Sequence, residues 1–165
     1  MGENSENSLL KRSTRHSKIA GDFGELLTLY WLSKNGYECA LVDHTGIDII
    51  AKGTNGVWGL SVKTRTRSAN MSKTGIGISI SDDIPKINAA CESFDCIPYV
   101  SFVVDVVEEK KIYLFILSCE HLKKIGGKSQ RLHCVYMSKR AIEKNFADPE
   151  IKSVVMHYSE FLTKN

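Results

Sequence analysis

The sequence lacks the marks of several protein classes. Its five cysteines are odd in number and include no Cys-x-x-Cys pair, which argues against a disulfide framework or a zinc site and favours reduced thiols. The longest apolar run falls far short of the ~20 residues that a membrane span needs. The polar N-terminus does not resemble a signal peptide. We therefore expect a cytoplasmic protein with no membrane segment.

A strong excess of one charge is also missing. The 165 residues carry a net charge of +3, which permits a polyanionic partner but does not by itself indicate one. The length and the 42% hydrophobic content predict one globular domain whose core needs no disulfide or metal. We expect a flexible basic arm over residues 1–18 and a single domain over residues 19–165.

Hydrophobic periodicity predicts the order of helices and strands. The first element is a helix over 19–35 with Phe23, Leu26, Leu27, Tyr30 and Trp31 in one apolar stripe, the usual sign of a face turned to the core. The remaining expected elements are strands 37–42, 47–52 and 57–63, a polar loop 64–77, a helix 83–94, strands 99–107 and 111–117, a short helix 119–124, a strand 132–137, a helix 139–145 and a strand 151–157. This order predicts an α/β or α+β layer fold with a mixed sheet.

One predicted hairpin gathers the residues that carry chemistry. If Asn55 and Gly56 form its turn, Asp48 faces Lys63, and Ser61 lies on the same face one diagonal step away. A longer loop would shift this pairing. An even shift keeps the three side chains on one face, and an odd shift separates them.

Such a cluster suits phosphodiester hydrolysis. Mg²⁺ prefers hard oxygen ligands, which the Asp48 carboxylate, the Val62 backbone carbonyl and the Ser61 hydroxyl offer. A divalent ion polarises a phosphate and activates water, and Lys63 can orient that water or stabilise charge in the transition state.

A row of cations follows the hairpin. If the strand continues, Lys63, Arg65 and Arg67 line one face, as phosphate binding would require. The arm offers further cations, of which we select Lys11, Arg12 and Arg15 as candidate nucleic-acid contacts.

These stretches resemble the PD-(D/E)XK nuclease superfamily, and within it the archaeal Holliday-junction resolvases and related restriction-type enzymes. Their pattern is a helix with Gly-x-x-Gly-Glu, then Gly-Tyr or Gly-Phe, an Asp between apolar residues, a hairpin and (Glu/Asp)-x-Lys. The matching segments here are residues 21–25 (GDFGE), 35–37 (NGY), 46–51 (GIDIIA) and 58–65 (WGLSVKTR).

The resemblance implies a restriction-endonuclease-like mixed β-sheet flanked by helices, with core order α-β-β-β-α-β, and Mg²⁺ or Mn²⁺ as cofactor. Asp48 matches the metal-binding aspartate, Lys63 the motif lysine and Glu25 the helix glutamate that often joins the site. Ser61 stands where the family has Asp or Glu, and a hydroxyl is a weaker ligand unless Glu25 compensates. The implied activity is that of a metal-dependent DNA endonuclease acting on branched or foreign DNA, and the resolvases act as dimers.

Alternatives remain open at this stage. A nuclease-like fold without cleavage could hold DNA or a protein partner, and Ser61 is the residue that separates this hypothesis from the enzyme. Asp48 could simply pair with Lys63, Glu25 could be solvated, and Arg65 and Arg67 could be ordinary loop charges. RNA as a partner is left open.

Overall fold

The computed structural model describes residues 13–67, 75–126 and 130–159. Its helices are α1 (His16–Lys34), α2 (Asp83–Ser93), α3 (Cys119–Ile125) and α4 (Lys139–Ala147), with a 3₁₀ turn η2 (Val107–Glu109). Its strands are β1 (Glu38–His44), β2 (Ile47–Gly53), β3 (Gly56–Arg67), β4 (Ile76–Ser79), β5 (Ile97–Val106), β6 (Lys111–Ser118), β7 (Leu132–Val135) and β8 (Lys152–His157).

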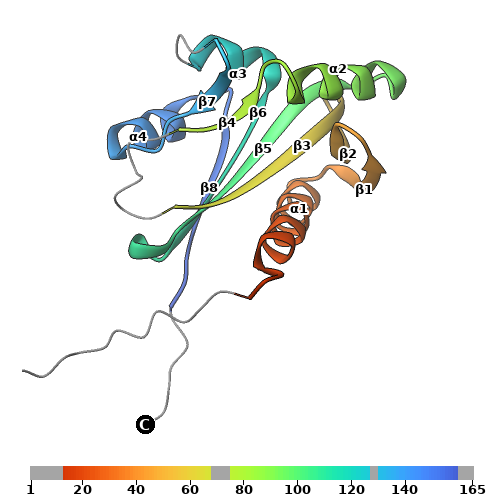
Figure 1. The fold of residues 1–165 in the computed structure, drawn as a ribbon. Coiled ribbons are helices and arrows are strands. Elements are labelled where there is room, and N and C mark those ends of the chain that lie inside the picture. Colours follow the sequence, from red (N-terminus) through yellow and green to blue (C-terminus); the bar gives the residue numbers. More distant parts are fainter. Residues whose placement is uncertain (1–12, 68–74, 127–129, 160–165) are drawn as a thin grey trace, which may run out of the picture.

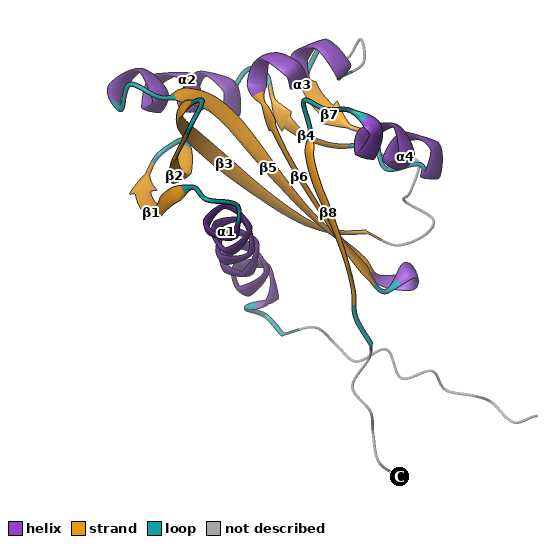
Figure 2. Ribbon diagram, turned by 180° about the vertical axis from the view of Figure 1, so that it is seen from behind, coloured by secondary structure: helices purple, strands orange, loops and turns teal. Residues whose placement is uncertain are grey.

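Six strands form one mixed sheet between helices. The strand order is β1-β2-β3-β5-β6-β8, in which β3 and β5 run parallel and all other neighbours run antiparallel. Helix α1 lies on one face, and α2 and α3 lie on the other with the small β4–β7 sheet (Figures 1 and 2). This is the mixed α/β fold class that the order of elements predicted.

Every predicted helix and strand is present, with ends that differ by a few residues, but the predicted loop over 64–77 is wrong at both ends. Strand β3 continues to Arg67, and β4 begins at Ile76. The side chains of Ile76 and Ile78 are buried, and β4 pairs antiparallel with β7. Two apolar residues among polar ones gave too weak a local signal for a strand whose partner lies more than fifty residues further on.

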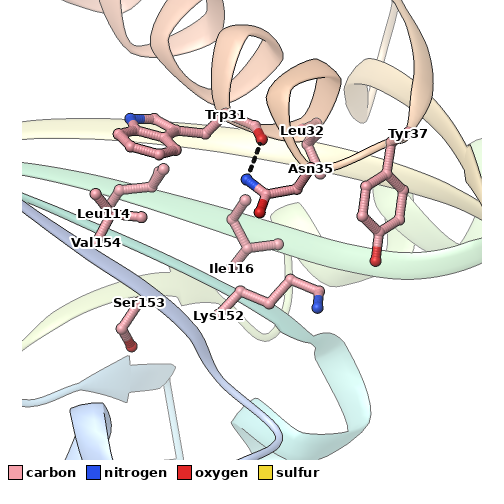
Figure 3. Close-up of a pocket in the computed structure, with 9 residues that line it drawn as sticks. All are labelled: Trp31, Leu32, Asn35, Tyr37, Leu114, Ile116, Lys152, Ser153 and Val154. Carbon is pink, nitrogen blue, oxygen red and sulfur yellow. Dashed lines mark hydrogen bonds between the residues drawn. The ribbon is translucent and has the colours of Figure 1, made fainter.

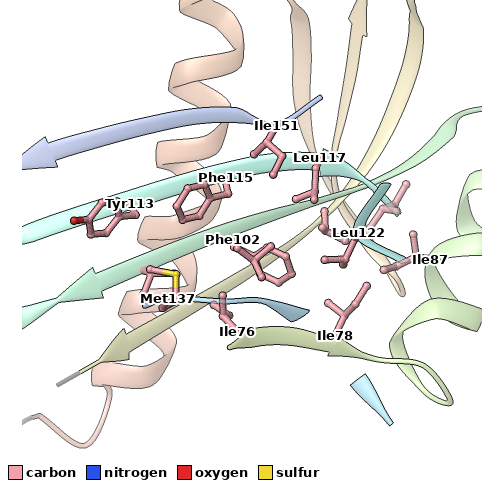
Figure 4. Packing of buried hydrophobic residues seen from close by; sticks show 14 of the residues in the cluster. Ile76, Ile78, Ile87, Phe102, Tyr113, Phe115, Leu117, Leu122, Met137 and Ile151 are labelled. Carbon is pink, nitrogen blue, oxygen red and sulfur yellow. The ribbon is translucent and has the colours of Figure 1, made fainter. Parts of the chain in front are cut away.

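The central strands bury side chains on both faces because each face is covered. On the side of α2 and α3, Phe102 and Phe115 pack with Leu122 and the isoleucines of β4 (Figure 4). On the side of α1, Leu60 and Leu114 form a second cluster with Leu32. The sheet therefore separates two cores, and the chemistry predicted from the hairpin lies where these layers end.

Helix α1 meets the sheet through two small residues and one of its leucines. Gly24, Thr28 and Leu32 are buried, and the Thr28 and Ser101 hydroxyls hydrogen-bond at 2.8 Å. A methyl group at Gly24 would overlap the Thr64 hydroxyl, so glycine here permits the close approach of helix and strand. No helix among the described residues, α1 included, has the length and apolar character of a membrane span.

Much of the predicted apolar stripe of α1 consequently faces solvent. Phe23, Leu26 and Tyr30 are 43%, 55% and 54% exposed, and Ile19 joins them at 54%. Of the predicted members, only Leu27 and Trp31 pack partly against the core. The assignment of the stripe to the core was wrong for three of its five members, because periodicity reveals an apolar face without revealing what covers it. We call Ile19, Phe23, Leu26 and Tyr30 the α1 stripe.

The predicted basic arm overlaps the start of α1. The helix begins at His16, and within it Lys18 pairs with Asp22 at 3.0 Å. Arg15 is exposed at the residue before the helix. Lys11 and Arg12 lie outside the described residues.

Candidate functional site

The β2–β3 hairpin has a register two residues away from the predicted one. Gly53 pairs with Gly56 and Ile49 with Leu60, so the turn residues are Thr54 and Asn55. Gly56 follows the turn with a φ of +105°, a left-handed conformation that glycine adopts without strain. Counting on from Ile49, Asp48 stands opposite Ser61 and not opposite Lys63. An even shift preserves the faces, and the predicted cluster survives.

Beyond the last backbone pair of β2 and β3, the Asp48 side chain continues the hydrogen bonding between the two strands. Its Oδ2 accepts a hydrogen bond of 2.6 Å from the Val62 amide. In an extended strand the N–H and C=O of one residue point to the same edge, so the Val62 carbonyl faces the side on which Asp48 lies. A carboxylate and a backbone carbonyl therefore share the open edge of β3.

Two cavities meet at Asp48. One, of about 420 Å³, has Glu25 of α1 and residues of β1 in its wall. The other, of about 230 Å³, is lined by Ser61, Val62 and Lys63 of β3. The structure thus gathers all five residues proposed for catalysis and metal binding around one carboxylate.

Ionisation of Asp48 and of Glu25 is opposed by their surroundings. Burial raises the pKa of Asp48, and the Val62 amide, the Lys63 charge and the Ser61 hydroxyl act against that rise. Burial also raises the pKa of Glu25, and the neighbouring charge of Asp48 raises it further. Mutual repulsion of this kind is relieved by a bound cation.

An unpredicted carboxylate joins the site from α2. Asp83 Oδ1 accepts a hydrogen bond of 2.9 Å from the Lys63 ammonium, and its Oδ2 accepts one of 2.7 Å from the Ser79 amide. Burial acts to raise the pKa of Asp83, but these two bonds and the Lys63 charge outweigh it and the pKa is lowered. The alternative in which Lys63 simply pairs with Asp48 is therefore wrong, because the ion pair that Lys63 forms is with Asp83.

Asp83 was not predicted as a site residue because no motif in the neighbouring sequence indicates such a role. Twenty residues separate it from Lys63, and an acidic residue in the first turn of a helix has a sufficient explanation in the helix dipole. His44 also lines the cavity of Glu25 and Asp48. Its Nδ1 lies 2.8 Å from the Thr45 carbonyl.

The oxygen donors present fit a hard divalent cation that keeps water ligands. Asp48, Glu25 and the Val62 carbonyl would hold it, with the Ser61 hydroxyl close by, and Mg²⁺ in proteins is commonly bound by one or two carboxylates plus waters. Within residues 13–67, 75–126 and 130–159, no three His, Cys, Asp or Glu side chains form a metal-binding cluster by themselves.

The expected cation row is only partly available. Arg65 is exposed, and its Nη1 donates to the Thr64 carbonyl. Arg67 is half-buried and donates to the Gly75 carbonyl beside β4, while Lys63 is engaged by Asp83. Strand β3 stays extended through Lys63, Arg65 and Arg67, as the row requires. Of these three side chains, that of Arg65 is the exposed one.

The pKa shifts predict opposite effects for two Asp→Asn substitutions. A raised pKa means that ionisation of Asp48 weakens the fold as pH rises above its ordinary value of 3.8, so Asp48→Asn should raise the free energy of unfolding at pH 7. A lowered pKa means that ionised Asp83 stabilises the fold, so Asp83→Asn should lower it. Both differences should shrink as pH falls below the pKa of each group. Urea unfolding from pH 3 to 7 measures this, and the reverse order at pH 7 would contradict it.

Comparison with known proteins gives a likeness among solved structures. No protein-family model matches the chain, and no curated protein sequence matches it. Among solved structures it is similar to Hjc from Archaeoglobus fulgidus, a Holliday junction resolvase from an archaeal hyperthermophile. Identity is 14%, the match covers 68% of this chain and 84% of that chain, and the TM-score is 0.47. At this level the likeness concerns the arrangement of helices and strands, and it assigns no role to any residue.

Proposed function

We propose that the chain is a divalent-metal-dependent DNA endonuclease of the PD-(D/E)XK type that acts on branched or foreign DNA. One observation carries the proposal: the Asp48 carboxylate, fixed by the Val62 amide, stands between Glu25 on one side and Lys63 on the other. This combines oxygen ligands for a cation with a lysine beside them, from three separate elements.

The chain's own residues divide the work of hydrolysis. Asp48, Glu25 and the Val62 carbonyl hold Mg²⁺ or Mn²⁺, which when bound polarises the phosphate and readies a water. Lys63 orients that water or stabilises charge on the phosphate oxygens. Asp83 positions the Lys63 ammonium through its hydrogen bond, at the cost of neutralising part of the lysine's charge.

A second function is favoured by a specific observation. Ser61 replaces the second acidic residue of the motif and is buried, so a nuclease-like module that binds DNA or a protein without cleaving DNA remains the alternative. Cytoplasmic location stays a prediction, as does the division into a basic arm and one domain.

Metal-dependent nicking of supercoiled plasmid separates the two functions. We expect Asp48→Ala and Lys63→Ala to lower the cleavage rate by about 100-fold or more, and Ser61→Glu to keep or raise it because a carboxylate binds Mg²⁺ better than a hydroxyl. If Glu25 supplies the missing ligand, Glu25→Ala should also be severe.

Lys52→Ala is the control for Lys63→Ala, because Lys52 is an exposed lysine of the same hairpin outside both cavities. Equal cleavage by the Asp48→Ala variant and the wild type would contradict the hypothesis of an endonuclease that acts through Asp48. If the wild type and all variants fail to cleave linear, supercoiled and branched DNA with either metal, the non-cleaving binding module is the function that stands.

DNA binding should depend on salt mainly through exposed cations. Arg65→Gln is expected to reduce the slope of log affinity against log salt by about 0.9, the value for one phosphate contact. Arg67→Gln should instead lower the thermal stability, because its guanidinium binds the Gly75 carbonyl. Fluorescence anisotropy on a labelled duplex at several salt concentrations tests this. An unchanged slope in the Arg65→Gln variant would show that Arg65 makes no phosphate contact.

We also propose that the α1 stripe mediates a homodimer. Its four side chains follow a 4-3-4 spacing along the helix, which matches the seam of two packed helices. A two-fold axis across an antiparallel pair would set Ile19 against Tyr30 of the partner subunit and Phe23 against Leu26 of the partner subunit. The stripe is therefore complementary to itself, as a two-fold interface must be.

Light scattering after gel filtration measures the mass of the particle. We expect a dimer for the wild type and a monomer for Leu26→Asp, since a buried unpaired carboxylate opposes helix association. Val107→Asp, at another exposed apolar residue, is the control and should stay dimeric. A monomeric wild type at micromolar concentration would contradict the proposal.

A further inference from the structure

A third cavity lies far along α1 from Glu25, between the C-terminal half of that helix and strands β6 and β8. Its volume is about 310 Å³, at the lower end of the range for small-molecule sites. Figure 3 shows Leu114, Ile116 and Val154 rising from the strands as its floor, with Trp31 at one end and Tyr37 at the other. We call this space the α1–β8 cavity.

The cavity arises because α1 does not reach across the whole sheet. The helix packs on β1, β2, β3 and β5, so the apolar side chains of β6 and β8 on this face are left beside it. Asn35, just past the end of the helix, donates from its side-chain nitrogen to the Trp31 carbonyl at 2.7 Å. This bond uses one of the two N–H donors of the side-chain amide, whose carbonyl oxygen is an acceptor at the cavity wall.

One lysine, Lys152, edges the cavity. Its ammonium lies 5.8 Å from the centre of the Trp58 ring and 5.9 Å from that of Tyr37. Lys152 forms no ion pair with any residue in the described ranges. Among the described residues that line the cavity there is no carboxylate.

These walls specify a ligand that is flat, apolar on its faces and anionic at its edge. Aromatic side chains offer surfaces on which a planar ring stacks, and nucleic-acid bases stack on them regardless of sequence. A lysine without an ion-pair partner favours an anion, and a nucleotide carries a phosphate on the sugar that bears its planar base. A cavity of this volume has room for one nucleotide and not for a base pair.

We propose that the α1–β8 cavity binds a single unpaired nucleotide, with its base against Trp31 at one end and its phosphate at Lys152. The nucleotide is either free or part of a single strand, because both sources present the same base and phosphate. This site is separate from the Asp48 site and does not require it.

Calorimetric titration in EDTA tests the site without engaging metal-dependent cleavage. The probes are deoxyadenosine monophosphate, deoxyadenosine, a short oligodeoxyadenylate and a blunt duplex of equal length. We expect the monophosphate or the single strand to bind, and the duplex and deoxyadenosine to bind at least about tenfold more weakly, since a charge-assisted contact is missing or the base is paired. Binding of the monophosphate alone assigns a free nucleotide, and binding of the strand alone assigns single-stranded DNA.

Substitutions locate the binding in the cavity. Lys152→Gln and Trp31→Leu should each weaken it about tenfold, whereas Lys52→Gln, at an exposed lysine of β2 outside the cavity, should not. The chain has two tryptophans, so quenching of their fluorescence gives a second readout on the unaltered protein. Absence of binding by both the monophosphate and the strand would overturn the proposal. So would equal affinity for deoxyadenosine, or undiminished binding in Lys152→Gln. None of these results bears on cleavage at Asp48.

Discussion

The mismatch in length between β2 and β3 is the constraint on which the site depends. Strand β3 pairs with β5 from Trp58 to Arg67, but its pairing with β2 ends near Leu60. A bare amide at such an edge is costly when water is partly excluded, and the Asp48 carboxylate accepts it. The bond that completes the backbone hydrogen bonding of the sheet thus also fixes the carboxylate.

The charges around Asp48 then divide into two halves with opposite effects on stability. Toward α1, Asp48 and Glu25 repel each other, and their ionised forms weaken the fold. Toward α2, Lys63 and Asp83 attract each other, and their pairing stabilises it. Repulsion between Asp48 and Glu25 lowers the stability of the fold, while Lys63 is held by Asp83 rather than by these two carboxylates. The proposed function therefore costs stability at the place where the cation would bind.

Helix α1 connects three features of the molecule. Its small residues allow close contact with the sheet, with Thr28 bonded to Ser101. Its large apolar residues are thereby left to the outer face as the α1 stripe, and its end leaves the α1–β8 cavity open beside β8. One packing choice, small side chains inward, accounts for the exposed stripe and the position of the helix beside Asp48 together.

The sequence by itself determined the helices and strands other than β4, since the alternation of Val100 to Val106 and the periodicity of α1 and α2 are local properties of the chain. It also predicted one face for Asp48, Ser61 and Lys63, a prediction that holds for any even shift of the hairpin register. The register itself depended on Gly56, whose left-handed φ moved the turn by one residue and the pairing by two.

Only the tertiary structure decided the rest. Which face of α1 is buried depends on the fit of Gly24 against Thr64, and the Lys63–Asp83 pair and the β4–β7 ladder join residues that are distant in sequence. At the α1–β8 cavity, Trp31 and Lys152 come from opposite ends of the chain. Contacts of this kind form when separately specified elements pack, and no local pattern encodes the partner that each will meet.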